Sequence, residues 1–164
     1  MTIDTKYLTI LEQFPSYTYK TTGNTYNLRP LSDDEISALQ NTYNGGASFP
    51  VVLQELLSLA GNFCYVLDYG PVDSQDEFQQ NVRKFLTNNS AKGHTITRPF
   101  FALDQYGGDQ FLFIYLDESV DDPTVYQATP YAKEGKDWLF NTGGTITTLI
   151  NQSMKLFLSG YNPF

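Results

Sequence analysis

The segment Phe111–Leu116 constrains the fold more than any other part of the chain. Its six residues, Phe-Leu-Phe-Ile-Tyr-Leu, are apolar at both the odd and the even positions. Successive side chains of a β-strand point to opposite faces of the sheet, so a strand with this sequence needs apolar cover on both sides. We therefore expect a strand in the middle of a sheet, covered on each face.

Two shorter β-favouring segments flank this strand in the chain, Phe100–Leu103 and Thr124–Thr129. The connections are short and rich in turn-forming residues, at Tyr106–Asp109 and Ser119–Pro123. Short connections favour antiparallel neighbours, because a parallel pair needs a crossover of a dozen or more residues. We predict three antiparallel strands in succession, and expect the two glycines of the first turn to adopt positive φ.

The rest of the chain is predicted to be mainly helical. Apolar residues recur at spacings of three and four, and a serine followed three positions later by glutamate marks two helix starts as capping boxes, at Ser32 and Ser74. A helix entered at Pro50 has a broad apolar face and ends at Gly61. The predicted helices cover residues 3–14, 32–43, 50–60, 74–86 and 146–157.

Three other segments lie between these helices and strands. A tyrosine-rich hairpin is predicted over Tyr17–Leu28, with its turn at Gly23 and Asn24. The apolar run Phe63–Leu67 is typical of a short buried strand. Asn141–Gly144 is predicted to be a turn that leads into the last helix.

These elements together predict an α+β fold in which a mostly antiparallel sheet of about four to six strands is packed by helices. The chain has 164 residues, which is close to the usual size of one domain. We expect residues 1–164 to form a single domain. The first helix and the hairpin, residues 1–30 approximately, are expected to be an extension of it.

The net charge restricts the class of partner. Eighteen acidic and ten basic residues give a formal charge of −8 at pH 7. This charge repels the phosphates of nucleic acids and of anionic membrane surfaces, and it speeds the encounter with a basic protein. We therefore expect a protein partner, and neither nucleic acid nor membrane.

Cysteine content and hydropathy indicate the compartment. Cys64 is the only cysteine, which excludes an internal disulfide and any zinc site with several cysteines. The first residues lack a basic segment followed by an apolar run, and no stretch approaches the roughly 18 apolar residues of a membrane span. These features predict a cytoplasmic protein.

Three segments, in this order, resemble the SUKH superfamily, specifically its Smi/Knr-like branch. They are Phe-Pro-Val-Val-Leu-Gln-Glu-Leu-Leu at 49–57, Phe-Ala-Leu-Asp-Gln-Tyr-Gly-Gly-Asp-Gln-Phe-Leu-Phe at 101–113 and Pro-Thr-Val-Tyr at 123–126. The likeness runs from about Leu31 to Ile150. Many members of that superfamily are immunity proteins that neutralise a cognate toxin by direct binding, so the resemblance implies this role.

The residues that could carry catalysis favour a structural interpretation. His94 is the only histidine, so a Ser-His or Cys-His catalyst would need it. Cys64 stands among apolar residues, where a small buried thiol is commoner than a reactive one. The carboxylates at 117–118 and 121–122 fit no calcium loop, and a solvated turn or a partner-binding patch explains them better. We expect no catalytic residue, cofactor or metal.

The sequence thus predicts a non-catalytic protein-binding domain, with an immunity protein as the preferred hypothesis and a basic nuclease-type toxin as one candidate partner. An intracellular adaptor or regulatory protein of the same fold is the alternative, and a small hydrolase is less favoured. We expect a monomer or a weak dimer. Acids and tyrosines in loops supply the candidate partner-binding residues: Asp68, Tyr69, Asp73, Tyr106, Asp117, Glu118, Asp121, Asp122 and Tyr126.

Overall fold

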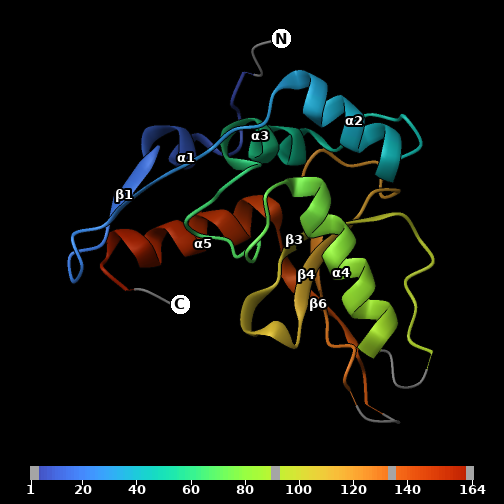
Figure 1. The fold of residues 1–164 in the computed structure, drawn as a ribbon. Coiled ribbons are helices and arrows are strands. Elements are labelled where there is room, and N and C mark those ends of the chain that lie inside the picture. Colours follow the sequence, from blue (N-terminus) through green and yellow to red (C-terminus); the bar gives the residue numbers. More distant parts are fainter. Residues whose placement is uncertain (1–3, 90–92, 133–135, 162–164) are drawn as a thin grey trace.

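The structure is a computed structural model that describes residues 4–89, 93–132 and 136–161. Within these residues it contains five α-helices, a two-stranded hairpin and a four-stranded antiparallel sheet (Figure 1). The predicted α+β class is therefore confirmed. In chain order the elements are α1 (Thr9–Gln13), β1 (Ser16–Thr18), β2 (Thr25–Asn27), α2 (Asp33–Tyr43), α3 (Val51–Ala60), α4 (Gln75–Asn89), β3 (Phe100–Asp104), the 3₁₀ turn η1 (Tyr106–Gly108), β4 (Phe111–Tyr115), β5 (Thr124–Ala128), β6 (Leu139–Thr145) and α5 (Ile146–Leu158).

The four-stranded sheet has the order β3-β4-β5-β6, so β4 lies in its interior as predicted. Phe113 pairs with Ala102 on one side and with Tyr126 on the other. The two glycines of the β3–β4 connection, Gly107 and Gly108, both have φ of +75°, which confirms the expected turn. A side chain at either position would be strained by this backbone conformation.

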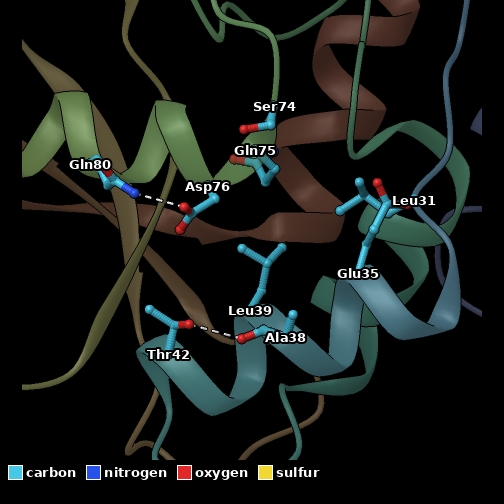
Figure 2. Close-up of a pocket in the computed structure, with 9 residues that line it drawn as sticks. All are labelled: Leu31, Glu35, Ala38, Leu39, Thr42, Ser74, Gln75, Asp76 and Gln80. Atoms are coloured by element: carbon cyan, nitrogen blue, oxygen red, sulfur yellow. Dashed lines mark hydrogen bonds between the residues drawn. The ribbon is translucent and has the colours of Figure 1, made fainter.

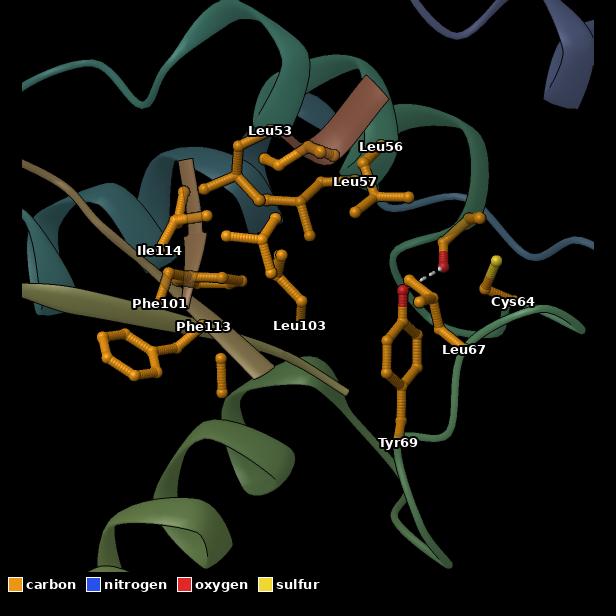
Figure 3. Packing of buried hydrophobic residues seen from close by; sticks show 14 of the residues in the cluster. Leu53, Leu56, Leu57, Cys64, Leu67, Tyr69, Phe101, Leu103, Phe113 and Ile114 are labelled. Atoms are coloured by element: carbon orange, nitrogen blue, oxygen red, sulfur yellow. Dashed lines mark hydrogen bonds between the residues drawn. The ribbon is translucent and has the colours of Figure 1, made fainter. Parts of the chain in front are cut away.

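Helices cover both faces of the sheet. On one face α4 crosses the strands (Figure 1), where Phe85 of α4 meets Phe111 with ring centroids 6.3 Å apart. On the other face α5 packs against β5 and β6, and α3 packs against α5. Phe111, Phe113 and Ile114 are fully buried, as a strand that is apolar on both faces requires. Figure 3 shows β4 side chains together with the leucines of α3 in this core.

Strand β6 was missed by the sequence analysis, which placed a turn at Asn141–Gly144. These residues instead form part of the edge strand, where Asn141 pairs with Tyr126 and Thr145 pairs with Thr124. The pairing is irregular between Thr124 and Tyr126, and Gly143 has φ of +78° next to this irregularity. Glycine at such a position marks a bulge as readily as a turn, and only the neighbouring strand distinguishes the two.

The predicted strand at Phe63–Leu67 is wrong. Apart from an isolated bridge between Phe63 and Arg29 the segment is irregular, and its Leu67 amide donates to the Cys64 carbonyl oxygen in a turn. Residues 64–67 are nevertheless all buried. A short apolar run predicts burial but does not by itself specify an extended backbone.

The first helix is shorter than predicted because a buried acid binds the backbone before it. Helix α1 begins at Thr9, and position 3 of the predicted helix lies outside the described residues. Glu55 of α3 is fully buried, and its carboxylate accepts hydrogen bonds at 2.9 Å from the backbone amides of Lys6, Tyr7 and Leu8. Leu8 and Leu11 are fully buried in the same hydrophobic cluster as the sheet. The N-terminal segment thus shares the main core.

Most of the sequence features that predicted the helix starts are confirmed. Ser32 and Glu35 form a complete capping box at α2. At α4 the Ser74 hydroxyl accepts from the Glu77 amide at 3.1 Å, while the Glu77 carboxylate accepts from the Asp73 amide, one residue earlier than a capping box requires. Pro50 lies immediately before α3, whose first residue is Val51.

Gly61 follows α3 as predicted, but its backbone stays right-handed, with φ of −66°. A Cβ there would lie 2.6 Å from the Leu57 carbonyl oxygen and 2.7 Å from the Leu31 side chain. Close approach of neighbouring atoms therefore requires glycine at this position, whereas a left-handed cap does not explain it.

Candidate functional site

The structure does not bring the nine predicted partner-binding residues together on one surface. Seven lie at the two ends of the sheet, Tyr69 lies in the interior, and Asp73 lies just before the start of α4. We call the end where β3 finishes and β4 begins the Asp104 end, and the end where β4 finishes and β5 begins the Asp117 end. Because β4 is five residues long, the two ends are separated by roughly 15 Å.

The acids at the Asp117 end are largely occupied by partners within the chain. Arg98 binds the Asp117 carboxylate in a bidentate manner, with Nε 3.1 and 3.0 Å from the two oxygens, and its guanidinium lies 3.7 Å from the centroid of the Tyr115 ring. These hydrogen bonds lower the pKa of Asp117. Glu118 accepts from the Tyr126 hydroxyl at 3.0 Å, which together with burial raises the pKa of that tyrosine.

Asp121 and Asp122 have structural partners as well. Asp122 accepts hydrogen bonds from the Thr145 hydroxyl at 2.7 Å and from the Thr147 amide at 3.2 Å, so it supports the first turn of α5. The backbone carbonyl of Asp121 accepts from the Val52 amide in the first turn of α3, and its carboxylate accepts from the Tyr7 hydroxyl at 3.3 Å. The β4–β5 turn is therefore a junction between the sheet and the starts of two helices.

Tyr69 lies in the core and is not available to a partner that docks on the surface. Its side chain is 8% exposed, and its hydroxyl donates to the Ala60 carbonyl oxygen at 3.1 Å (Figure 3). Burial raises its pKa well above the usual value. An aromatic residue next to an acid and a glycine looks like a loop residue in the sequence, and only the packing of α4, whose Phe78 ring lies 5.3 Å away, places it inside.

Asp68 and Tyr106 lie at the Asp104 end. The Asp68 carbonyl oxygen accepts from the Gln105 amide at 2.9 Å, while Tyr106 is 46% exposed at the start of η1. Between them is Asp104, which the sequence analysis did not select. It is 6% exposed, and burial, with a further contribution from Asp68, raises its pKa to about 7. An acid that ends an apolar strand was the available signal.

A largely apolar hollow that reaches the surface is a groove between α2 and the start of α4, which we call the α2–α4 groove. Its volume is about 320 Å³. Figure 2 shows Leu39 between the two helices and Leu31 beside Glu35 ahead of α2, with Ala38 and Thr42 on α2 and Asp76 and Gln80 on α4. Both leucines are buried, at 7% and 5% exposure, and form the floor, while Ala38 and Thr42 are exposed on the wall.

The lining of the α2–α4 groove contains acids and no basic side chain. Between Pro30 and Val82 the chain has no lysine, arginine or histidine, and it has eight acidic residues. Two of these acids line the groove, Glu35 from α2 and Asp76 from α4. The other six are Asp33, Asp34, Glu55, Asp68, Asp73 and Glu77. Of the nine predicted residues, Asp73 is the one next to this groove.

Arg83, the first basic residue after this acidic stretch, contacts residues that do not line the groove. Arg83 of α4 donates to the Phe100 carbonyl oxygen at 2.8 Å, and its guanidinium lies 4.3 Å from the Tyr43 and the Phe100 ring centroids. The Tyr43 hydroxyl donates to Asp76 at 2.6 Å, and burial and this hydrogen bond raise the pKa of the tyrosine. The ring of Tyr43 thus contacts Arg83 while its hydroxyl binds Asp76, which also accepts from Gln80 at 2.7 Å and interacts with the charge of Arg83.

Cys64 and His94, the two residues considered for nucleophilic catalysis, both make contacts that support the fold. Cys64 is fully buried, and burial raises the pKa of its thiol to about 12, which keeps it protonated at neutral pH. His94 stacks on Trp138 with ring centroids 4.6 Å apart, and its Nδ1 lies 3.3 Å from the Pro130 carbonyl oxygen. No three His, Cys, Asp or Glu side chains lie close enough to hold a metal ion in the part of the chain that the structure describes.

No protein-family model matches this chain, and no curated protein and no solved structure is significantly similar to it. Among the described residues, no helix combines the length and the apolar character needed to cross a membrane. The geometry of the groove and of the two ends of the sheet therefore carries the functional argument.

Proposed function

We propose that this chain is a non-catalytic protein-binding domain of the immunity type, which neutralises a basic toxin by direct contact, and that the α2–α4 groove is its docking surface. One observation carries the proposal. An apolar hollow is lined by two acids, Glu35 and Asp76, and by no lysine, arginine or histidine, so a partner gains both apolar burial and charge complementarity there.

The occupant that fits this groove is a basic surface segment of the partner. An apolar side chain of that segment would cover Leu31 and Leu39, while flanking lysines or arginines would approach Glu35 and Asp76. A nuclease is the preferred toxin class, because the surface with which it binds phosphates is basic. The acids at the Asp117 end support this interpretation less, since several of them are bound within the chain.

The first experiment tests the function as a whole. Each toxin encoded next to this chain would be expressed with and without it, and growth and co-purification would be measured. We expect growth to be restored and the two proteins to purify together. Failure of both with every neighbouring toxin would refute the immunity function, and capture of a housekeeping protein instead would favour the alternative of a cellular adaptor.

The second experiment tests the docking surface with two variants of α2. Ala38→Lys places a long cationic side chain in the groove, whereas Ser37→Lys adds the same charge to the adjacent exposed position, which does not line it. We expect Ala38→Lys to weaken the complex at least about tenfold, equivalent to about 1.4 kcal/mol, and Ser37→Lys to weaken it much less. Equal affinities of the two variants would place the docking surface elsewhere.

A further inference from the structure

A second pocket lies at the Asp104 end of the sheet, on a different side of the fold from the α2–α4 groove. Its volume is about 370 Å³, within the range of small-molecule sites. Residues from β3, β4, β5 and α5 line it together with the ends of two loops. The lining residues are Val66, Asp104, Tyr106, Gln110, Phe111, Leu112, Gln127, Ser153 and Tyr161.

One acceptor in this pocket lacks a partner. Asp104 is 6% exposed, and its Oδ1 is buried without a hydrogen bond from any residue that the structure describes. Leaving a buried carboxylate oxygen unpaired is costly, and native proteins rarely do so without a ligand, an ion or a functional reason. The backbone amides of Asp68 and Tyr106 stabilise the carboxylate and lower its pKa, yet its Oδ1 has no donor among the described residues.

The chemistry around Asp104 favours a cation. The pocket lining contains no lysine, arginine or histidine. The rings of Tyr106 and Tyr161 are 46% and 56% exposed, and such faces attract ammonium groups. Gln110 and Gln127, joined by a 2.9 Å hydrogen bond, add polar groups to the wall. Val66 and Leu112 supply an apolar surface for an alkyl stem.

We propose that this pocket binds the primary ammonium group of a small organic amine, with the Asp104 carboxylate as its ion-pair partner and with the alkyl stem against Tyr106, Tyr161 and Leu112. The ammonium group pairs with the carboxylate that lines the pocket and stabilises its ionised form, which is otherwise buried. This inference is independent of the toxin-binding proposal, because it uses other residues.

Charge repulsion couples Asp104 to the other ionisable groups around it. The Asp68 carboxylate raises the pKa of Asp104, whereas the backbone amides of Asp68 and Tyr106 lower it. Asp104 in turn raises the pKa of the Cys64 thiol and of the Tyr69 hydroxyl, which are neutral at pH 7. A bound cation is expected to offset the repulsion from Asp68 and to bring the pKa of Asp104 down.

The test is a titration of the folded chain, followed by two-dimensional NMR, with butylammonium chloride and with the neutral 1-butanol as a probe of similar length. We expect saturable shifts of the Gln110, Gln127 and Ser153 amides with butylammonium only, at about millimolar affinity. Asp104→Asn should weaken binding by about 10- to 100-fold, the effect of losing a charge-assisted hydrogen bond. Asp109→Asn removes an acid of the same hairpin that does not line the pocket, and it should bind as the parent does.

A second readout needs no variant. The carboxyl resonance of Asp104 in the unaltered chain should titrate at a pH lower by about one unit when butylammonium is saturating, since the bound cation favours the ionised form. Absence of saturable shifts, equal binding of 1-butanol, or an unchanged midpoint would each overturn the proposal. So would equal binding by a folded Asp104→Asn variant.

Discussion

The acids of the β4–β5 turn and the acids around the α2–α4 groove look alike in the sequence but have different environments in the fold. In the turn, Asp117, Glu118 and Asp122 each bind a partner within the chain. Around the groove, Glu35 accepts from Ser32 and Asp76 accepts from Tyr43 and Gln80, all of them neutral residues, and the groove lining contains no lysine, arginine or histidine. The acids of the turn hold the sheet and the start of α5 in place, whereas those of the groove border an apolar hollow whose lining has no basic side chain and so leave a negative potential for a partner. Substituting single acids should expose this difference.

The largest effect on the free energy of unfolding is expected at Glu55, a fully buried acid that accepts three hydrogen bonds from backbone amides. Glu55→Ala leaves the amides of Lys6, Tyr7 and Leu8 without their acceptor in the interior, and we expect a loss of about 3–5 kcal/mol in the free energy of unfolding. Urea denaturation measures it. Glu55→Gln keeps one carbonyl oxygen and should lose less. A loss below about 1 kcal/mol for Glu55→Ala would contradict the role of Glu55 in holding the N-terminal segment.

Asp104 should have the second largest effect on the free energy of unfolding, and this effect should depend on pH. Its pKa is about 7 in the folded protein and near 3.8 in the unfolded chain, so the folded state binds the proton more tightly. The resulting stabilisation is present below about pH 4 and is lost as the pH rises through 7. The difference corresponds to at most about 4 kcal/mol.

Asp104→Asn removes this titration. Without added amine, the variant should match the parent near pH 4 and exceed its stability at pH 8 by up to about 4 kcal/mol. Denaturation curves of both proteins at several pH values measure the difference. A constant difference from pH 4 to pH 8 would show that the carboxyl has an ordinary pKa.

Asp122 should contribute less, because its partners are half-buried. Asp122→Ala removes the acceptor of the Thr145 hydroxyl and of the Thr147 amide at the start of α5, and a loss of about 1–2 kcal/mol is expected. Thermal denaturation measures it. Asp137, which is exposed on the β5–β6 connection, offers a control in Asp137→Ala, for which a change within about 0.5 kcal/mol is expected. Equal losses in both variants would assign no structural role to Asp122.

The smallest effect on stability is expected in the α2–α4 groove itself. Ala38→Lys and Ser37→Lys both lie at exposed positions of α2, and each should change the free energy of unfolding by no more than about 0.5 kcal/mol. The same two variants should differ in partner binding. A large loss of stability in Ala38→Lys would mean that the groove is part of the core and not a docking surface.

Much of the fold could be predicted from patterns that act over a few residues. The doubly apolar β4, the glycine turn before it, the capping box of α2 and the apolar face of α3 were all predicted correctly. The errors occurred where distant contacts decide. Residues 64–67 are buried but irregular, and 141–144 belong to β6, in which Asn141 pairs with Tyr126 of β5, in place of forming a free turn. Edge strands that contain glycine have little intrinsic preference for extended structure.

The candidate site was predicted less well than the fold. The sequence indicated an acidic protein and named acids and tyrosines, but it could not tell which of them were free. Tyr69 is in the core, Asp122 supports a helix, and Asp104 was not selected although it lies in a pocket. The stretch from Pro30 to Val82 was the available signal for the groove, since eight acids without a basic residue are visible in the chain itself.

The sequence by itself determined the net charge, the helix starts and the strand that must lie inside a sheet, because these depend on composition and on periodicity over a few residues. Only the tertiary structure decided which carboxylates are bound within the chain and which face a groove. Burial and hydrogen bonding depend on residues that are far apart in sequence, as between Glu55 and Lys6 or between Asp122 and Thr145. Those contacts decide which acids hold distant segments together and which border a groove.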